Sequence, residues 1–230
     1  IFDNAVAPAP WTLPSHASLF TGLSGLQHGA SEEYPRLRPN MVTLAETLKQ
    51  RGYFTVGTVA NPWLSRDRGF AQGFDRYFEF WKLRSARLPF LYTLIAPLES
   101  AGLLHGVDPR EDKGARLLTA LGTRTLREVD GRVPLFLFMN LIDAHPPFQP
   151  PAPYRARFLP AEARAQGIDP DRVSQSWTAL LTGDISLSSA EQAVLRGLNR
   201  GEIAYMDDYL GRVIAALKAA GRYDNALIAV

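Results

Sequence analysis

The 230-residue sequence contains no cysteine, which excludes disulfide frameworks, thiolate metal sites and cysteine nucleophiles. It also lacks a long unbroken apolar run. The most apolar stretch, residues 88–104, is interrupted by Pro89, Pro97 and Glu99, so it provides no evidence for a membrane span. Lysine and arginine form no continuous stripe, and 25 of them against 23 acidic residues give a net charge of +2. We therefore expect no nucleic-acid partner, whereas a small anionic substrate fits this composition.

Hydrophobic residues make up 46% of the chain and charged residues 21%, which is typical of an ordinary globular protein. A chain of this length buries roughly 70% of its extended surface on folding, enough for one substantial core. The sequence begins at Ile1 rather than methionine and ends in an apolar run at Val230. We therefore expect residues 1–230 to be one domain cut from a longer protein.

Three apolar segments are typical of buried parallel strands, and each follows a helical pattern. The expected strands are residues 53–59, 134–141 and 226–230, and the expected helices before them are residues 41–51, 115–129 and 189–220. Thr43 and Glu46 have the spacing of a capping box at the start of the first helix. This alternation predicts an α/β fold with a mainly parallel sheet.

The long helix of residues 189–220 carries an apolar stripe that we expect to face the core. Its members are Ile203, Met206, Leu210, Val213 and Leu217. Two other stretches interrupt the helix–strand rhythm. Residues 81–110 are apolar and broken by prolines, and residues 146–188 contain seven prolines, so we expect insertions or lid segments there.

The most informative segment, residues 7–25, reads A-P-A-P-W-T-L-P-S-H-A-S-L-F-T-G-L-S-G. Its run from Pro14 to Thr21 predicts a short helix closed by Gly22, with Thr12 at or just before the N-terminus. The Thr12 hydroxyl has two interpretations: a helix cap, favoured for an isolated Thr-x-Pro, or a nucleophile. The second interpretation is supported by the position of the hydroxyl at the positive end of the helix, which favours an anionic nucleophile and whose free N–H groups can bind an oxyanion substrate.

This segment resembles the signature of the sulfatase family, within the alkaline phosphatase superfamily. The family motif is Cys/Ser-x-Pro-Ser-Arg followed by a short helix and Thr-Gly, with the first residue as nucleophile. Here Thr12-Leu13-Pro14-Ser15-His16 occupies those five places and Thr21-Gly22 closes the motif. The resemblance also covers residues 2–5, 44–55, 73–75, 140–147 and 203–211. It implies a three-layer α/β/α sandwich of alkaline-phosphatase type, with residues 1–230 as a single catalytic domain incomplete at both ends.

The departures from the family pattern concern the chemistry. Thr12 cannot become formylglycine, the aldehyde hydrate of standard sulfatases, and His16 replaces the motif arginine. Ala60 and Pro62 stand where the family often has a lysine and a histidine. The resemblance then implies a metal-dependent hydrolase of a sulfate or phosphate ester that acts by direct attack of Thr12 through a covalent intermediate. The alternatives are a phosphotransferase of the same superfamily and a non-catalytic anion-binding relative.

Further candidates follow two of the expected strands, where open parallel sheets bind ligands. His145 resembles the family's substrate-contacting histidine, although a histidine before prolines is equally a turn residue. Asp143 either orients the imidazole or caps the turn. Asn61 ends the other strand and either reaches the same crevice or forms a turn with Pro62. With His16, we expect these residues to bind the substrate.

The resemblance also implies one or more divalent cations, Ca²⁺ or Zn²⁺/Mn²⁺. In the family an Asp pair after the first strand and an Asp-His or Asp-Asn after a late strand hold the metal. Both sets fall outside residues 1–230, so Thr12 is the one metal-adjacent residue we name. We expect the isolated segment to bind such cations poorly.

The remaining polar residues favour ordinary surface roles. Asp207 and Asp208 are expected on the solvated side of the long helix. His28 and His105 are interpreted as surface or loop positions. Arg66, Asp67 and Arg68 either line the rim of the pocket or form a solvated charge cluster, and the second interpretation is favoured.

Overall fold

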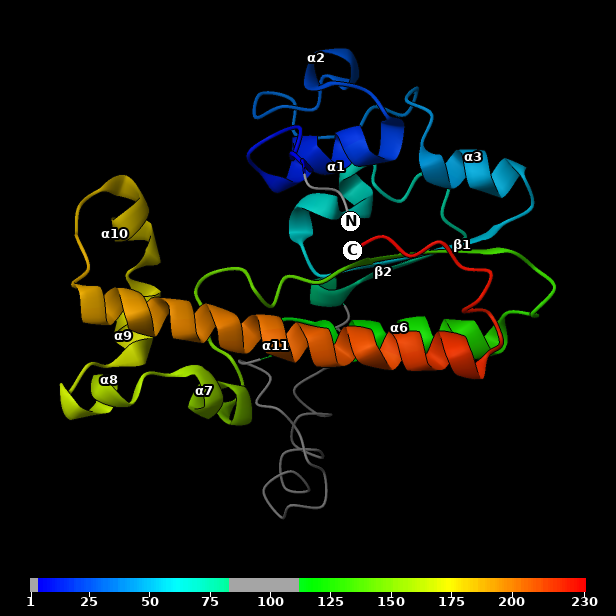
Figure 1. Ribbon diagram of the computed structural model, residues 1–230. Coiled ribbons are helices and arrows are strands. Elements are labelled where there is room, and N and C mark those ends of the chain that lie inside the picture. Colours follow the sequence, from blue (N-terminus) through cyan, green and yellow to red (C-terminus); the bar gives the residue numbers. More distant parts are fainter. Residues whose placement is uncertain (1–3, 83–111) are drawn as a thin grey trace. The chain divides into compact units, whose positions relative to one another are not determined.

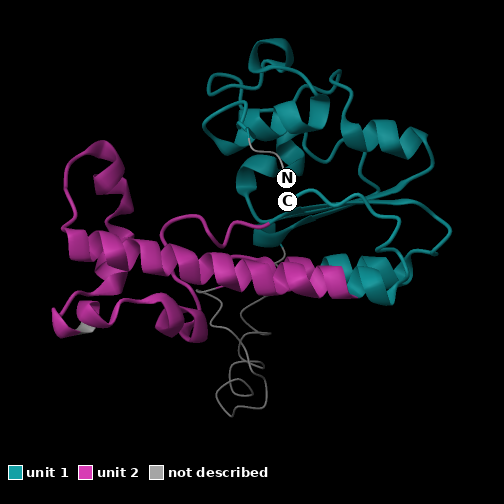
Figure 2. Ribbon diagram, viewed as in Figure 1, with its two compact units in different colours: residues 1–84, 120–140, 216–230 teal, residues 85–119, 141–215 magenta. Residues whose placement is uncertain are grey.

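The computed structural model describes residues 4–82 and 112–230, which divide into two compact units (Figure 2). Unit 1 comprises residues 1–84, 120–140 and 216–230, and unit 2 comprises residues 85–119 and 141–215. His105 and nearly all of the expected insertion at residues 81–110 lie outside the described residues.

Helices and parallel strands alternate along the described residues. In chain order the elements are α1 (Thr12–Thr21), α2 (Gly25–His28), α3 (Leu44–Gln50), β1 (Phe54–Val59), η1 (Pro62–Leu64), η2 (Arg66–Arg68), β2 (Arg76–Glu79), α6 (Ala115–Glu128), β3 (Leu135–Asn140), α7 (Ala152–Phe158), α8 (Ala161–Ala165), α9 (Pro170–Gln175), α10 (Trp177–Thr182) and α11 (Ser189–Ala219). None of the helices in the described part of the chain has the length and hydropathy that a membrane span requires.

The three strands form one parallel sheet in the order β2-β1-β3. Val59 of β1 pairs with Asn140 of β3, so both strands end at the same edge. This sheet confirms the strands expected at residues 53–59 and 134–141. Strand β2 has only four residues and was not expected from the sequence.

The strand expected at residues 226–230 is wrong. Those residues have no regular secondary structure, and Leu227 and Val230 are fully exposed. The backbone N–H of Ala226 donates to the carbonyl of Tyr223, which is a turn bond rather than a ladder bond. Apolar residues form a strand only when a neighbouring strand accepts their hydrogen bonds, and no strand of the described residues pairs with this segment.

Helices cover both faces of the sheet in unit 1 (Figure 1). On one face, Phe20 of α1 meets Phe138 of β3 edge-on, with ring centroids 4.8 Å apart. On the other face, Gly122 of α6 lies against Met139, whose sulfur is 3.1 Å from the position of a Cβ added at Gly122. Because alternate β3 side chains meet different helices, the arrangement confirms the expected α/β sandwich.

Helix α1 begins at Thr12, two residues before the expected start at Pro14. Pro14 is tolerated because the first helical turn makes no use of its missing N–H. Leu13, Ala17 and Phe20 recur on one face and are buried. Gly22 ends the helix at φ +68°, and its N–H donates to the Ser18 carbonyl at 2.8 Å. The buried face of α1, including the contact of Phe20 with Phe138 of β3, therefore packs the helix against the sheet.

Helix α3 begins at Leu44, three residues after the expected start at residue 41, and the expected capping box of Thr43 and Glu46 is confirmed. The Thr43 hydroxyl accepts from the Glu46 N–H, and the Glu46 carboxylate accepts from the Thr43 N–H at 2.8 Å. Gly73 approaches the backbone of Glu46 so closely that a Cβ added there would collide with the Glu46 nitrogen. The same glycine has φ +81°, which also favours glycine.

His28 is buried, contrary to the expected surface or loop position. Its Nδ1 accepts the Ala30 N–H at 3.0 Å, so the neutral ring carries its proton on Nε2, 3.0 Å from the Ser18 hydroxyl. Burial lowers the pKa of His28, opposed by a hydrogen bond from the ring to the Pro14 backbone carbonyl. A ring with both nitrogens satisfied is stable inside the core, and sequence spacing alone gives no sign of those partners.

In unit 2, the proline-rich stretch at residues 146–188 folds into the short helices α7 to α10. Helix α11 confirms the expected long helix to within one residue. The expected apolar stripe is confirmed at Val213, which is buried, and wrong at Ile203. Ile203 is half exposed, whereas the buried face includes Leu198, Glu202, Tyr205 and Tyr209. The buried face of α11 therefore differs from the expected stripe, because it includes the charged residue Glu202.

Candidate functional site

Thr12 is the first residue of α1, and its hydroxyl does not cap that helix. The N-cap residue is Trp11, which makes no side-chain cap hydrogen bond. Instead, Thr12 Oγ1 accepts a hydrogen bond from Asn61 Nδ2 at 3.1 Å. The hydroxyl therefore lies at the positive end of a ten-residue helix and has its own donor.

Asn61 is buried just beyond β1, where two bonds fix its position. Its Oδ1 accepts the Trp63 N–H at 3.0 Å, which directs Nδ2 towards Thr12. Its own N–H donates to Asn140 Oδ1 at 3.1 Å. Asn61 thus forms the expected turn and also reaches Thr12, so the two interpretations of this residue are compatible.

Asn140 was not among the expected site residues. It ends β3, where its carbonyl accepts the Ala60 N–H at 3.0 Å and its side chain accepts the Asn61 N–H. Asn140, Asn61 and Thr12 are therefore linked by consecutive hydrogen bonds. The sequence did contain a signal for Asn140, because it is a polar residue at the end of an otherwise apolar strand.

His16 lies one helical turn after Thr12, and its Nδ1 is 2.8 Å from the Thr12 carbonyl oxygen. Because a carbonyl only accepts, Nδ1 carries the proton and the neutral ring has its free lone pair on Nε2. Burial lowers the pKa of His16, opposed by this hydrogen bond to Thr12. Burial therefore favours the neutral form of His16, unlike the permanently charged arginine of the motif it resembles.

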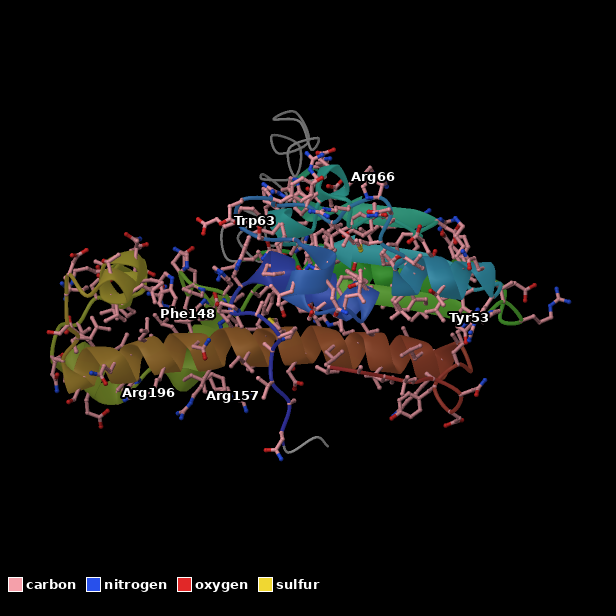
Figure 3. The ribbon with its side chains drawn as sticks, turned by 90° about the horizontal axis from the view of Figure 1, so that it is seen from above. Tyr53, Trp63, Arg66, Phe148, Arg157 and Arg196 are labelled. Atoms are coloured by element: carbon pink, nitrogen blue, oxygen red, sulfur yellow. The ribbon has the colours of Figure 1, made fainter. Side chains whose placement is uncertain are left out.

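Two tryptophans are adjacent in the chain to the residues of this group: Trp11 precedes Thr12, and Trp63, labelled in Figure 3, follows Asn61 by two positions. Trp11 and Trp63 meet edge to face with centroids 5.1 Å apart, and the Arg68 guanidinium lies 4.2 Å from the Trp63 ring centroid. Arg68 also donates to the Pro35 carbonyl at 2.6 Å, so it is more than the solvated surface charge expected. Arg66 is exposed, as expected.

Asp143 and His145 belong to unit 2, whereas Thr12, His16 and Asn61 belong to unit 1. Asp143 is 1% exposed, and its Oδ1 accepts the Lys113 N–H at 3.0 Å. Burial, reinforced by the charge of Asp112, raises the pKa of Asp143 to about 6. His145 is exposed with Nδ1 2.7 Å from the Pro146 carbonyl oxygen, so Asp143 anchors the turn rather than the imidazole.

The described residues do not by themselves form a metal site. Between residues 4–82 and 112–230, no three His, Asp or Glu side chains are grouped so that they could hold a metal ion. Thr12 offers a single hydroxyl oxygen, which already accepts from Asn61. Asp207 and Asp208 are exposed on α11, as expected, and Asp208 accepts a hydrogen bond from the Tyr154 hydroxyl.

Comparison with known proteins gives a match over the whole chain. A family model described as sulfatase matches residues 1–230. The multifunctional alkaline phosphatase superfamily protein PehA of Trinickia caryophylli is 26% identical over 275 residues, covering 99% of this chain and 53% of that protein.

Two solved structures share the fold. The phosphonate monoester hydrolase of Agrobacterium radiobacter has a TM-score of 0.67 at 23% identity, covering 95% of this chain and 52% of that one. The phosphonate monoester hydrolase SpPMH of Silicibacter pomeroyi has a TM-score of 0.58 at 19% identity, covering 92% and 51%. The chain therefore spans about half the length of the relatives it matches.

Proposed function

Because the chain belongs to the sulfatase family, we propose that the protein hydrolyses a sulfate or phosphate ester with Thr12 as its nucleophile. The observation that carries this proposal is the hydrogen bond from Asn61 Nδ2 to Thr12 Oγ1 at 3.1 Å. A donor on the hydroxyl oxygen favours its deprotonated form, and the N-terminus of α1 adds positive potential. The names of the similar hydrolases support the same reaction class.

In the proposed reaction, Thr12 Oγ1 forms a bond to sulfur or phosphorus while the bond to the esterified alcohol breaks. The alcohol leaves with a proton, and the group stays on Thr12 as a covalent intermediate. Water then attacks the same sulfur or phosphorus atom and releases sulfate or phosphate, which restores the threonine hydroxyl. The N–H groups of the first turn of α1 have no acceptor within the helix and are suited to bind the transferring oxyanion.

His16 is assigned to the substrate through Nε2, since Nδ1 is held by the Thr12 carbonyl. A neutral ring accepts a hydrogen bond at Nε2, whereas a protonated ring donates one to an oxyanion. We retain His145 and Asp143 as expected substrate-binding residues from the family resemblance, with Asp143 acting through the backbone of its own turn.

Members of the sulfatase family generally depend on a divalent metal. We propose that Thr12 is its one contact within residues 1–230 and that the other ligands lie outside them. The described residues alone do not fit such an ion, so the steps above involve only the side chains of this chain.

The test is turnover by the whole protein of aryl sulfate, phosphate monoester, phosphate diester and phosphonate monoester substrates. Thr12→Ala should lower kcat at least about a thousandfold, whereas Thr12→Ser should retain part of the rate. Thr21→Ala, which changes a threonine at the other end of α1, is the matched control and should keep turnover. An active Thr12→Ala variant contradicts the nucleophile. Transfer to added glycerol indicates a phosphotransferase, and tight ester binding without turnover indicates an anion-binding protein.

A further inference from the structure

Lys113 lies just before α6 in unit 2, and its ammonium group is surrounded by oxygen atoms. Nζ is 2.8 Å from the Asp143 carbonyl, 2.6 Å from the His145 carbonyl and 2.8 Å from the Pro147 carbonyl. The fourth oxygen is Glu202 Oε1 of α11, at 2.7 Å. Three alternate carbonyls of a single loop therefore converge on a single side chain.

This arrangement exceeds what an ordinary lysine hydrogen bond requires. An ammonium group has three N–H donors, yet four acceptors lie within 2.8 Å of Nζ. Backbone carbonyls together with a carboxylate are the ligands by which proteins hold hard cations. Three of the four N···O distances, at 2.7–2.8 Å, exceed the roughly 2.3–2.6 Å of calcium sites, and the fourth, at 2.6 Å, lies at the upper end of that range.

Further contacts attach both ends of the loop to the same two residues, Lys113 and Glu202. The Lys113 N–H donates to Asp143 Oδ1 at 3.0 Å, and the Gln149 N–H donates to Glu202 Oε1 at 2.6 Å. Between these ends, the Ala144 N–H donates to the Met206 sulfur of α11 at 3.3 Å. Lys113 and Glu202 thus connect the whole of residues 143–149 to α11.

Beyond the anchored turn, the loop enters the core of unit 2. Phe148 packs with Val194 and Leu198 of α11 in one buried cluster (Figure 3). Glu202 follows Leu198 by one helical turn and is 1% exposed, so its charge requires a buried partner. Lys113 is that partner. The loop is thus held by this ion pair and its hydrogen bonds on one side and by the packing of Phe148 on the other.

We propose that Lys113 is a tethered cation around which residues 143–149 fold, and that it is the positioning residue for His145. The carbonyl of His145 is bound directly to the ammonium group, while its imidazole is left exposed. The cation site stands independently of the reaction, whereas the consequence for His145 rests on the proposed function.

The experiment removes the ammonium group and supplies it again from solution. In the whole protein, Lys113→Ala leaves a space lined by the four oxygens, which methylammonium fits. Amide hydrogen exchange of residues 143–149 should become at least about tenfold faster, because one charge-assisted hydrogen bond corresponds to about that factor. Methylammonium should restore slow exchange, and tetramethylammonium, which has no N–H donor, should not.

Two further variants separate charge from packing. Lys113→Met keeps a long side chain without the charge, so exchange of the loop should be fast and methylammonium should not restore it. Lys218→Ala, which removes an exposed lysine of α11, should exchange as the wild type with or without methylammonium. The proposal is overturned if the loop of Lys113→Met exchanges as slowly as the wild type. It is also overturned if neither methylammonium nor tetramethylammonium restores slow exchange in Lys113→Ala. If Lys113→Ala does not fold, its helical circular dichroism must return with methylammonium but not with tetramethylammonium.

Kinetics then test the positioning of His145. Lys113→Ala should raise KM for the ester more than it lowers kcat, and methylammonium should reverse the rise. An unchanged KM in a variant whose loop exchanges quickly contradicts the positioning role. If the wild type hydrolyses none of the esters, the proposed function fails, and the exchange measurements still decide the cation site.

Discussion

Replacing Glu202 by glutamine should change how stability depends on pH. Glu202 is 1% exposed and its Oε2 has no hydrogen-bond partner among the described residues. Burial raises the pKa of Glu202 from 4.5 to about 7, although Lys113 opposes the rise. The folded protein therefore holds a proton between these two pH values that the unfolded chain releases.

The size and sign follow from linkage. Because the folded state binds more protons there, the free energy of unfolding falls as pH rises from 4.5 to 7. A difference between 4.5 and about 7 corresponds to about 3 kcal/mol. Glutamine does not titrate and retains an Oε1 acceptor for Lys113. Glu202→Gln should therefore match the wild type near pH 5 and exceed it by up to about 3 kcal/mol at pH 8.

The assay is urea unfolding of both proteins at pH 5, 6, 7 and 8, with linear extrapolation to water. Glu191→Gln is the matched control because it makes the same change at the N-terminal end of α11. Hydrogen bonds from Ser188 lower the pKa of Glu191, so its contribution should be constant between pH 5 and 8. A wild type that gains stability relative to Glu202→Gln as pH rises would refute the reasoning, since the pairing with Lys113 would then outweigh burial.

Three further predictions concern unit 1. If protonated His16 binds the oxyanion, kcat/KM should fall as pH rises through the pKa of His16, which burial holds below 6.5. His16→Gln should remove this fall from the pH profile of kcat/KM. A variant with the same pH profile as the wild type contradicts the role of His16. Asn140→Ala leaves the Asn61 N–H without its acceptor and should cost roughly 1–3 kcal/mol in urea unfolding, while Asn140→Asp should cost less. Gly73→Ala should lower stability by at least about 2 kcal/mol, and more than Gly22→Ala, which has a similar positive φ but open space around it.

The sequence predicted those parts of the fold whose signals are local. The apolar runs of β1 and β3, the capping box of Thr43 and Glu46 and the length of α11 all depend on neighbours within a few residues. Residues 226–230 have the same local signal as a strand, but pairing decides whether a strand forms, and their sequence contains nothing about pairing. Conversely, β2 is too short for its pattern to stand out.

The buried face of α11 shows what local patterns omit. Leu198, Glu202, Tyr205 and Tyr209 follow helical spacing, and the glutamate made this face look solvated. Its partner Lys113 lies 89 residues earlier in the chain, so no periodicity reveals the ion pair. His28 was misplaced for the same reason, since its ring is satisfied by Ser18 and Ala30 in a buried turn.

The arrangement at Thr12 follows from the backbone groups left over where the strands end. Beyond β1 the backbone N–H of Asn61 has no ladder carbonyl to meet, and a buried N–H without an acceptor is costly. Asn140 provides that acceptor from the end of β3 with its side chain. The side chain of Asn61 then bonds to Trp63 through Oδ1, which leaves Nδ2 for the Thr12 hydroxyl. The position of the proposed nucleophile thus depends on hydrogen bonds that end two neighbouring strands, so a change at Asn140 acts on Thr12 without contacting it.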